Sequence, residues 1–347
     1  MEEDQNDTLG RTLISITTTS RRRTRQFFSF REIDQNEPIE YDESFEELVK
    51  KTWTLWGVSS LFNFQYDDEI KMKMYAKKLR EEVARSILKE NVSYTAKFTQ
   101  LNNFGPKPSP KDAPAIRIDL FATLGTVETC VYTGFLISWR TSTIELINHE
   151  SVSLPLLLCK GTQSTIGAVH SVLSRMFDCI VTPLPINEHD LKWLTAINLS
   201  ALGSKGKSKD DLMIFEYVVP RLSIADTINV KFTYRDLRKL WTNVCVGDEE
   251  SEQTIRIECV EKLFKITNRQ MLELAGLNLG LCRLHKLSLP AFSIVGNRMK
   301  VMNAETLNNI LLFLNEIALE VAHIYPLGDD FNSSSVSNVQ NVETPSN

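Results

Sequence analysis

Residues 159–170 read CKGTQSTIGAVH and bring a thiol, a hydroxyl and an imidazole together around two glycines. These are side chains that a hydrolase uses as nucleophile and base. A nucleophile elbow requires the pattern Gly-x-Ser-x-Gly, but the glycines here stand three residues before and three residues after Ser164. The stretch is also typical of a helix start capped by Thr162 or Ser164, and six residues of helix turn His170 about 120° away from Ser164. We therefore expect a capped helix and no catalytic pair.

Residues 201–208, ALGSKGKS, resemble a phosphate-binding Walker A loop with alanine in place of the first glycine. Such a loop must leave a strand and open a helix, because the helix N-terminus supplies part of the phosphate cradle. Here the order is inverted, since a helix capped by Asn187 and Asp190 would precede the loop and the strand-like residues 213–219 follow it. The pattern favours a solvated basic loop, with contact to a nucleic-acid backbone as the alternative.

The remaining titratable residues do not suggest further chemistry. Six cysteines and five histidines are scattered along the chain, and no two cysteines form the CxxC pair of a zinc site. Their spacing fits reduced, buried thiols better than a disulfide framework. No paired carboxylates stand in an acid–base context. The sequence therefore predicts a protein that is not an enzyme, with no catalytic residue, no cofactor and no metal ligand.

The net charge of the 347 residues is −5, and 42% of them are hydrophobic, which is enough to bury a large core. An acidic molecule lacks the basic field of an autonomous DNA-binding protein, so any nucleic-acid contact must be local. There is no run of 18 apolar residues, and the N-terminus is acidic, so neither a transmembrane helix nor a secretory signal is indicated. We expect an intracellular protein with no membrane contact and no small-molecule substrate.

The N-terminal region is divided by charge. Six arginines and no acid lie in residues 11–31, whereas eight acids and no base lie in residues 32–47. Such blocks cannot bury a core, so residues 1–43 are predicted to be a disordered arm and residues 327–347 a disordered tail. The arm is typical of a solvated tail or nuclear-import signal; the alternative is an arm that touches DNA and is silenced by phosphorylation of Thr24. The candidate DNA contacts, from the arm and the basic loop, are Arg21, Arg22, Arg23, Arg25, Lys205, Lys207 and Lys209.

The folded body is predicted to be α+β, with mostly antiparallel sheets packed against helices, because short connections join successive strand-like runs. These runs are residues 92–101, 115–122, 127–139, 212–219 and 227–234. Further strands are predicted at residues 269–275, 279–289 and 292–302, the last folded into a hairpin at Gly296 and Asn297. Asn303 then caps a long amphipathic helix. We expect an N-terminal α/β part, residues 44–150, and a C-terminal α+β part with the partner-binding sheet, residues 151–326.

Collinear stretches between residues 45 and 321 carry a resemblance to a known family. They are KTWTL at 51–55, LFNF at 61–64, LPLLL at 154–158, the helix at 161–177, FDCIVTPLPIN at 177–187, LKW at 191–193, LW at 240–241 and LNEIAL at 314–319. No single stretch is a chemical signature, and the specificity comes from the series. Together they resemble the centromere protein L family, whose members are subunits of the inner kinetochore.

This resemblance implies a non-catalytic structural subunit of the constitutive centromere-associated network, located in the nucleus at the centromere and kinetochore. The implied partners are centromere protein N, as a heterodimer, other inner kinetochore subunits, and centromeric nucleosome and DNA within the assembly. The subunit would help to anchor the kinetochore to centromeric chromatin for chromosome segregation in mitosis. The alternative is a stand-alone nucleic-acid-binding protein, or an enzyme, of similar fold.

The partner interface is expected in the sheet of residues 269–302. Five leucines, at positions 277, 279, 281, 287 and 289, alternate on one face, while Leu284 lies on the other. The final helix can cover only one face, which would leave a strand edge or the Leu284 side open to strand addition. A fully internal sheet is the alternative, and the resemblance favours the interface. The candidate interface residues are Leu284, Lys286, Leu287, Leu289, Phe292 and Ile294.

Overall fold

The computed structural model describes residues 25, 27–29, 43–87, 91–102, 104–105, 112–139, 151–200, 211–223, 226–245 and 254–323. The strands are β1 (Phe27–Ser29), β2 (Thr52–Val58), β3 (Leu61–Phe62), β4 (Val92–Leu101), β5 (Ala115–Leu124), β6 (Val127–Ile137), β7 (Ser151–Val152), β8 (Leu156–Gly161), β9 (Val181–Pro183), β10 (Leu212–Val218), β11 (Thr227–Thr233), β12 (Thr254–Arg256), β13 (Arg283–Ser288), β14 (Phe292–Val295) and β15 (Arg298–Val301). The helices are α1 (Glu43–Glu46), α2 (Glu69–Ser86), α3 (Gln163–Phe177), α4 (Glu188–Ser200), α5 (Tyr234–Cys245), α6 (Ile257–Ala275), the 3-10 turn η1 (Leu279–Leu281) and α7 (Ala304–His323).

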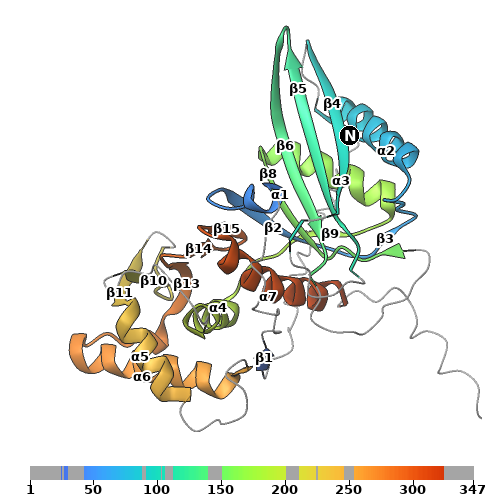
Figure 1. Cartoon of the computed structure of the whole chain (residues 1–347). Coiled ribbons are helices and arrows are strands. Elements are labelled where there is room, and N and C mark those ends of the chain that lie inside the picture. Colours follow the sequence, from blue (N-terminus) through green and yellow to red (C-terminus); the bar gives the residue numbers. More distant parts are fainter. Residues whose placement is uncertain are drawn as a thin grey trace, which may run out of the picture.

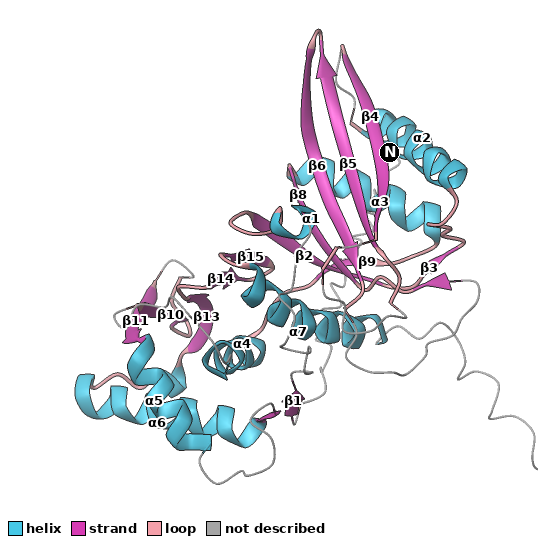
Figure 2. Cartoon of the chain, viewed as in Figure 1, coloured by secondary structure: helices cyan, strands magenta, loops and turns pink. Residues whose placement is uncertain are grey.

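One large antiparallel sheet runs through the molecule (Figure 2). Its strand order is β11-β10-β13-β14-β15-β2-β8-β6-β5-β4, and β9 also pairs with β2. Strand β15, near the end of the chain, pairs with β2, near its start, so the sheet takes strands from both sides of residue 150. The predicted α+β class, with antiparallel pairing and a long helix after the C-terminal strands, is confirmed. The division of the body at residue 150 stays a prediction.

Helices cover the sheet on opposite faces, and the alternation of side chains along β8 shows how. Leu157 and Cys159 are buried in the cluster that contains α2 and α3, whereas Leu156 and Leu158 are buried in the cluster that contains α7. The two clusters are therefore separated by the sheet itself. Beyond the central strands, α5 and α6 pack on each other and on α4, which lies against β13 and α7 (Figure 1).

Several helix starts follow from local signals, as expected. The backbone N–H of Asp190 donates to Asn187 Oδ1 and the N–H of Asn187 donates to Asp190 Oδ2, both at 2.9 Å, so the predicted cap of α4 is confirmed. Asn303 Oδ1 accepts from the N–H of Thr306 at 2.8 Å at the start of α7. The hairpin of β14 and β15 turns at Gly296, whose φ of 56° is the left-handed conformation that glycine adopts easily.

The strand predicted at residues 269–275 is wrong, because α6 continues to Ala275. Val260, Leu263, Phe264 and Thr267 keep helical spacing on the buried side of α6, and Met271 packs against the same cluster one turn later. The helix ends at Gly276, whose N–H bonds back to the carbonyls of Leu272 and Met271. The predicted strand at 279–289 begins only at Arg283, since η1 occupies Leu279–Leu281.

The prediction that residues 1–43 form a disordered arm is wrong for Phe27–Ser29, which form β1 and pair with β12. Phe28 is 1% exposed and belongs to the main hydrophobic cluster. Burying a phenylalanine side chain contributes about 2–3 kcal/mol, which is enough to hold a short segment in place. The charge blocks on either side concealed this aromatic stretch. The rest of the arm, apart from Arg25 and Glu43, and the tail at residues 327–347 lie outside the described residues.

Candidate partner-binding sheet and basic segments

The stretch 159–170 forms the end of β8 and the start of α3, as expected. Thr162 is the N-cap, and its hydroxyl accepts from the N–H of Thr165 at 3.4 Å. His170 lies 5% exposed, with Nε2 3.3 Å from the hydroxyl of Tyr132 on β6 and its ring edge-on to Trp56. Burial lowers the pKa of His170 to about 4, so the imidazole is neutral at physiological pH. His170 is thus part of the packing between α3 and the sheet, and the predicted capped helix is confirmed.

The thiol that opens the same stretch is also buried. Cys159 is 0% exposed, its Sγ lies 3.1 Å from the hydroxyl of Thr54, and burial raises its pKa to about 11. A thiol with such a pKa stays protonated and is a poor nucleophile. None of the six cysteines, all within the described ranges, forms a disulfide, and these ranges contain no group of three His, Cys, Asp or Glu side chains placed to hold a metal ion. No helix in the described part of the chain is long and apolar enough to cross a membrane.

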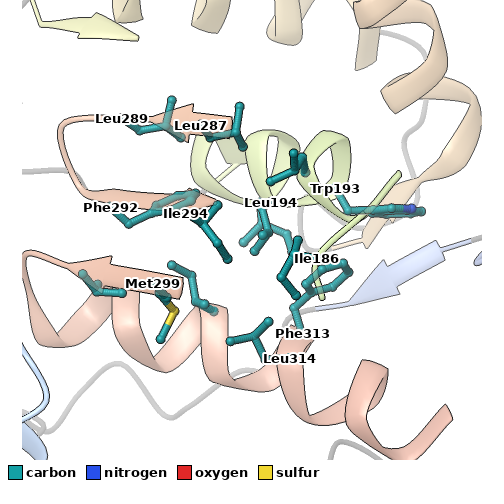
Figure 3. Packing of buried hydrophobic residues seen from close by; sticks show 14 of the residues in the cluster. Ile186, Trp193, Leu194, Leu287, Leu289, Phe292, Ile294, Met299, Phe313 and Leu314 are labelled. Carbon is teal, nitrogen blue, oxygen red and sulfur yellow. The ribbon is translucent and has the colours of Figure 1, made fainter. Parts of the chain in front are cut away.

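The predicted partner-interface residues lie in the protein's own core. Leu284, Leu287, Phe292 and Ile294 are at most 1% exposed, and Leu289 is 7% exposed. Leu287 of β13, Leu289 just after it, and Phe292 and Ile294 of β14 belong to one cluster with Trp193 and Leu194 of α4 and Phe313 and Leu314 of α7 (Figure 3). Lys286 is the one polar member of the set, and its Nζ donates to Glu216 of β10 at 2.9 Å.

The expectation of an unsatisfied edge or face at Leu284 is therefore wrong. Strand β13 lies inside the sheet, with β10 on one side and β14 on the other, so its backbone groups are paired in the chain itself. Leu284 stands opposite Tyr217 of β10 and is covered by the same cluster as the other leucines. The sequence pattern assigned one face to the core and left the Leu284 side open, whereas the structure buries Leu284 and Leu287 in the same cluster and leaves Leu281 70% exposed.

The open edge of the C-terminal half of the sheet is β11, which sequence reasoning identified as a strand but not as an edge. It pairs with β10 over seven residues, and among the described strands no other pairs with it. Val230 is 5% exposed and Ile228 and Phe232 pack against the core, while Asn229 and Lys231 are exposed. The opposite end of the sheet is β4, which packs against α2. The order of the strands decides which strand lies at the edge of the sheet. That order depends on contacts between residues that are distant in the sequence.

Of the predicted DNA contacts, only Arg25 lies among the described residues; Arg21, Arg22, Arg23, Lys205, Lys207 and Lys209 lie outside them. The guanidinium of Arg25 forms ion pairs with Glu316 and Glu320 of α7, the latter at 3.1 Å. It also lies over the ring of Phe313, 5.0 Å from the centroid. The Arg25 side chain is only 11% exposed, so in this conformation its charge is paired with carboxylates of the same chain.

Comparisons with known proteins extend the resemblance along the body. A sequence model described as "Centromere protein L" matches residues 47–319. The chain is 25% identical over 288 residues to centromere protein L of Xenopus tropicalis, an alignment that covers 78% of this chain and 79% of the relative. It is 22% identical over 306 residues to the protein of the same name in Bos taurus, covering 83% and 85%. It is 22% identical over 288 residues to that of Homo sapiens, covering 78% and 80%.

Proposed function

The chain belongs to the centromere protein L family, and from that premise we propose that it is a non-catalytic structural subunit at the centromere. The observation that carries the proposal is the family match, which runs through residues 47–319 and so includes the whole sheet from β2 to β15. The chemistry of the described residues is consistent with it. The groups that suggested a nucleophile, Cys159 and His170, are buried, and their altered pKa values result from that burial.

Within this role, the chain would form a heterodimer with centromere protein N, in the nucleus, and help to anchor the inner kinetochore to centromeric chromatin. We place the contact at β11. A strand that ends a sheet offers a row of N–H and C=O groups, and a strand from a partner can satisfy them and continue the sheet. The residues first expected at the interface, on β13 and β14 and between them, would then stabilise the interior of the sheet.

The direct test of pairing is size-exclusion chromatography of the chain with and without centromere protein N. We expect the two proteins to elute together and the chain alone to self-associate, because an open edge also pairs with other copies. Two separate peaks at micromolar concentration, with a monomeric, stable chain, would contradict the heterodimer.

A pair of proline variants tests the place of the contact. Successive residues of a strand direct their N–H groups to opposite sides, so of Ile228 and Asn229 one faces β10 and the other faces outward. Proline at the inward residue should lower the melting temperature, because it removes a ladder bond. Proline at the outward residue should leave the melting temperature unchanged and abolish co-elution with centromere protein N. Retention of co-elution by both variants would place the contact elsewhere.

Two basic segments of the chain are candidates for contact with DNA. We propose that Lys205, Lys207 and Lys209, together with Arg21, Arg22 and Arg23, contact phosphates weakly and without sequence preference, and only within the assembled complex. The net charge of −5 supports this restriction, because the isolated chain repels a polyanion at long range. Arg25 is left out of this set, since its guanidinium pairs with Glu316 and Glu320.

A further inference from the structure

The described residues 25 and 27–29, here called the strap, lie on the C-terminal half of the chain. The strap pairs antiparallel with β12, with Phe28 opposite Ile255 and Ser29 opposite Thr254. Figure 1 shows β1 beside the start of α6 and close to α7, well away from the sheet strands β4, β5 and β6. The strap therefore joins two helical units of the C-terminal half, since β12 leads directly into α6.

The first residue that anchors the strap is Arg25. The guanidinium contacts carboxylates of Glu316 and Glu320, which stand one turn apart on α7, and it lies 5.0 Å from the centre of the Phe313 ring. The carboxylate side chains are 26% and 30% exposed and that of Arg25 is 11% exposed. A partly buried site with two carboxylates and an aromatic face recognises arginine by charge, by hydrogen-bond geometry and by its flat shape.

Its second anchor is Phe28, three residues later. The Phe28 ring meets Phe313 edge to face, with centroids 5.7 Å apart, and is 1% exposed. Phe313 thus contacts both anchors, and β12 supplies the backbone pairing beside them. A surface that pairs with the backbone of an extended peptide and holds its side chains in pockets recognises that peptide by strand addition.

We propose that β12 and the flank of α7 that carries Phe313, Glu316 and Glu320 form a docking site for an extended peptide with the pattern Arg-x-x-Phe, and that the strap is its ligand in cis. A two-stranded ribbon of three residues is not stable by itself, so the anchors provide the affinity. Covalent linkage supplies an effective concentration in the millimolar range, so that a ligand of millimolar affinity suffices to occupy the site in cis.

Anchoring changes what the preceding arginines can reach. Arg23 is two residues from Arg25, and therefore within about 7 Å of the anchored backbone at full extension. If the chain were attached only at Glu43, twenty residues after Arg23, the same residue could reach about 70 Å from that point. The docking site therefore determines where the basic cluster can act, whatever it binds.

The first experiment measures access to Arg25 in the full chain by trypsin, which must take the arginine side chain into its own pocket. The variant Glu316→Gln/Glu320→Gln removes both carboxylates, and Glu305→Gln, exposed on the first turn of the same helix, is the matched control. Cleavage after Arg25 should be roughly fivefold faster or more in the double variant, because proteolysis follows the opened population. The control should match the native chain. Equal rates in all three proteins would overturn the proposal.

The second experiment measures docking directly. A fluorescein-labelled peptide of residues 21–33 is titrated by anisotropy against the full-length native chain and against full-length Arg25→Ala/Phe28→Ala, whose own strap no longer competes. The vacated site should bind the peptide with a Kd on the order of 0.1–1 mM, and the native chain should bind it roughly tenfold more weakly. A peptide that carries the same two substitutions should not bind either protein.

Three outcomes count against the proposal. Equal affinity of the peptide for the native and vacated chains would show that it binds elsewhere. No binding to a vacated chain that keeps its native circular dichroism would show that the surface recognises no peptide. If the native chain is a dimer by light scattering, and Arg25→Ala makes it a monomer, the strap belongs to a second copy and the cis arrangement is wrong. If Phe28→Ala prevents folding, Arg25→Ala alone serves as the vacated chain, and the same results decide.

Discussion

Trp139, two residues after β6, makes polar contacts with α7 inside the core. Its backbone N–H donates to Asn315 Oδ1 at 2.9 Å, and its indole N–H donates to Asn308 Oδ1 at 3.0 Å. Both asparagines are on α7, and Trp139 and Asn315 are 0% exposed. A buried donor without its acceptor costs the full free energy of its desolvation. Local sequence could not reveal this contact, because 169 and 176 residues separate the partners.

Replacing Asn308 or Asn315 by alanine should therefore destabilise the chain by about 1–3 kcal/mol. Urea unfolding followed by circular dichroism gives the free energy of unfolding of each variant. Asn309→Ala, at the next and half-buried position of α7, is the matched control and should change it by less than about 0.5 kcal/mol. A loss of stability at Asn308 or Asn315 no larger than that of the control would show that Trp139 does not depend on α7.

His170 predicts a pH dependence of stability. Burial lowers its pKa from 6.5 to about 4 in the folded chain. Between these two values the unfolded chain binds the proton and the folded chain does not, so stability falls as the pH falls from 6.5 to about 4 and is level above that window. The full effect is on the order of 3 kcal/mol.

The comparison that isolates this effect is the native chain against His170→Gln, with the free energy of unfolding measured between pH 7.5 and pH 4.5. The native chain should become less stable on acidification to a greater extent than the variant, whose amide does not titrate. Parallel pH profiles would mean that the imidazole is hydrated or already protonated in the folded chain.

At the scale of elements, local sequence patterns correctly predicted the helix caps and the turn, which depend only on neighbouring residues. The caps at Thr162, Asn187 and Asn303 and the turn at Gly296 agree with the structure, because a cap or a turn is decided within a few residues. Strand order, unlike a cap or a turn, depends on contacts between residues that are distant in the sequence. The same leucines fit an edge strand and an internal one, and β13 is internal because β10 and β14 reach it from opposite directions along the chain. The candidate interface was misplaced for that reason.

Leu284→Asp tests the internal position of β13. A carboxylate at a site that is 1% exposed would lack a charge partner in the core, so we expect destabilisation by at least about 3–5 kcal/mol or failure to fold. The matched control is Leu281→Asp, three residues earlier, where the native side chain is 70% exposed. It should fold normally. A folded Leu284→Asp chain with native stability would contradict the burial of β13.

At the scale of the whole molecule, the charge distribution sets how DNA can be held. The chain as a whole carries a net charge of −5, so basic segments contribute where the assembly brings them to DNA. Lys205→Gln/Lys207→Gln/Lys209→Gln in the complex with centromere protein N should reduce the slope of log K against log salt by about 0.9 for each phosphate that the loop no longer neutralises. Neutralising the exposed lysines 239, 262 and 265 of α5 and α6 is the control for net charge. Equal slopes in the two triple variants would remove Lys205, Lys207 and Lys209 from the DNA surface.

The central claim is that this chain is a structural subunit that continues its sheet into a partner through β11. Hydrogen–deuterium exchange of the full chain, with and without centromere protein N, tests it most directly, because strand addition protects backbone amides along the added edge. We predict strong protection of residues 227–233 on addition of centromere protein N and no change in β4, the other end of the same sheet. Unchanged exchange in β11, or protection confined to β4, would contradict the account.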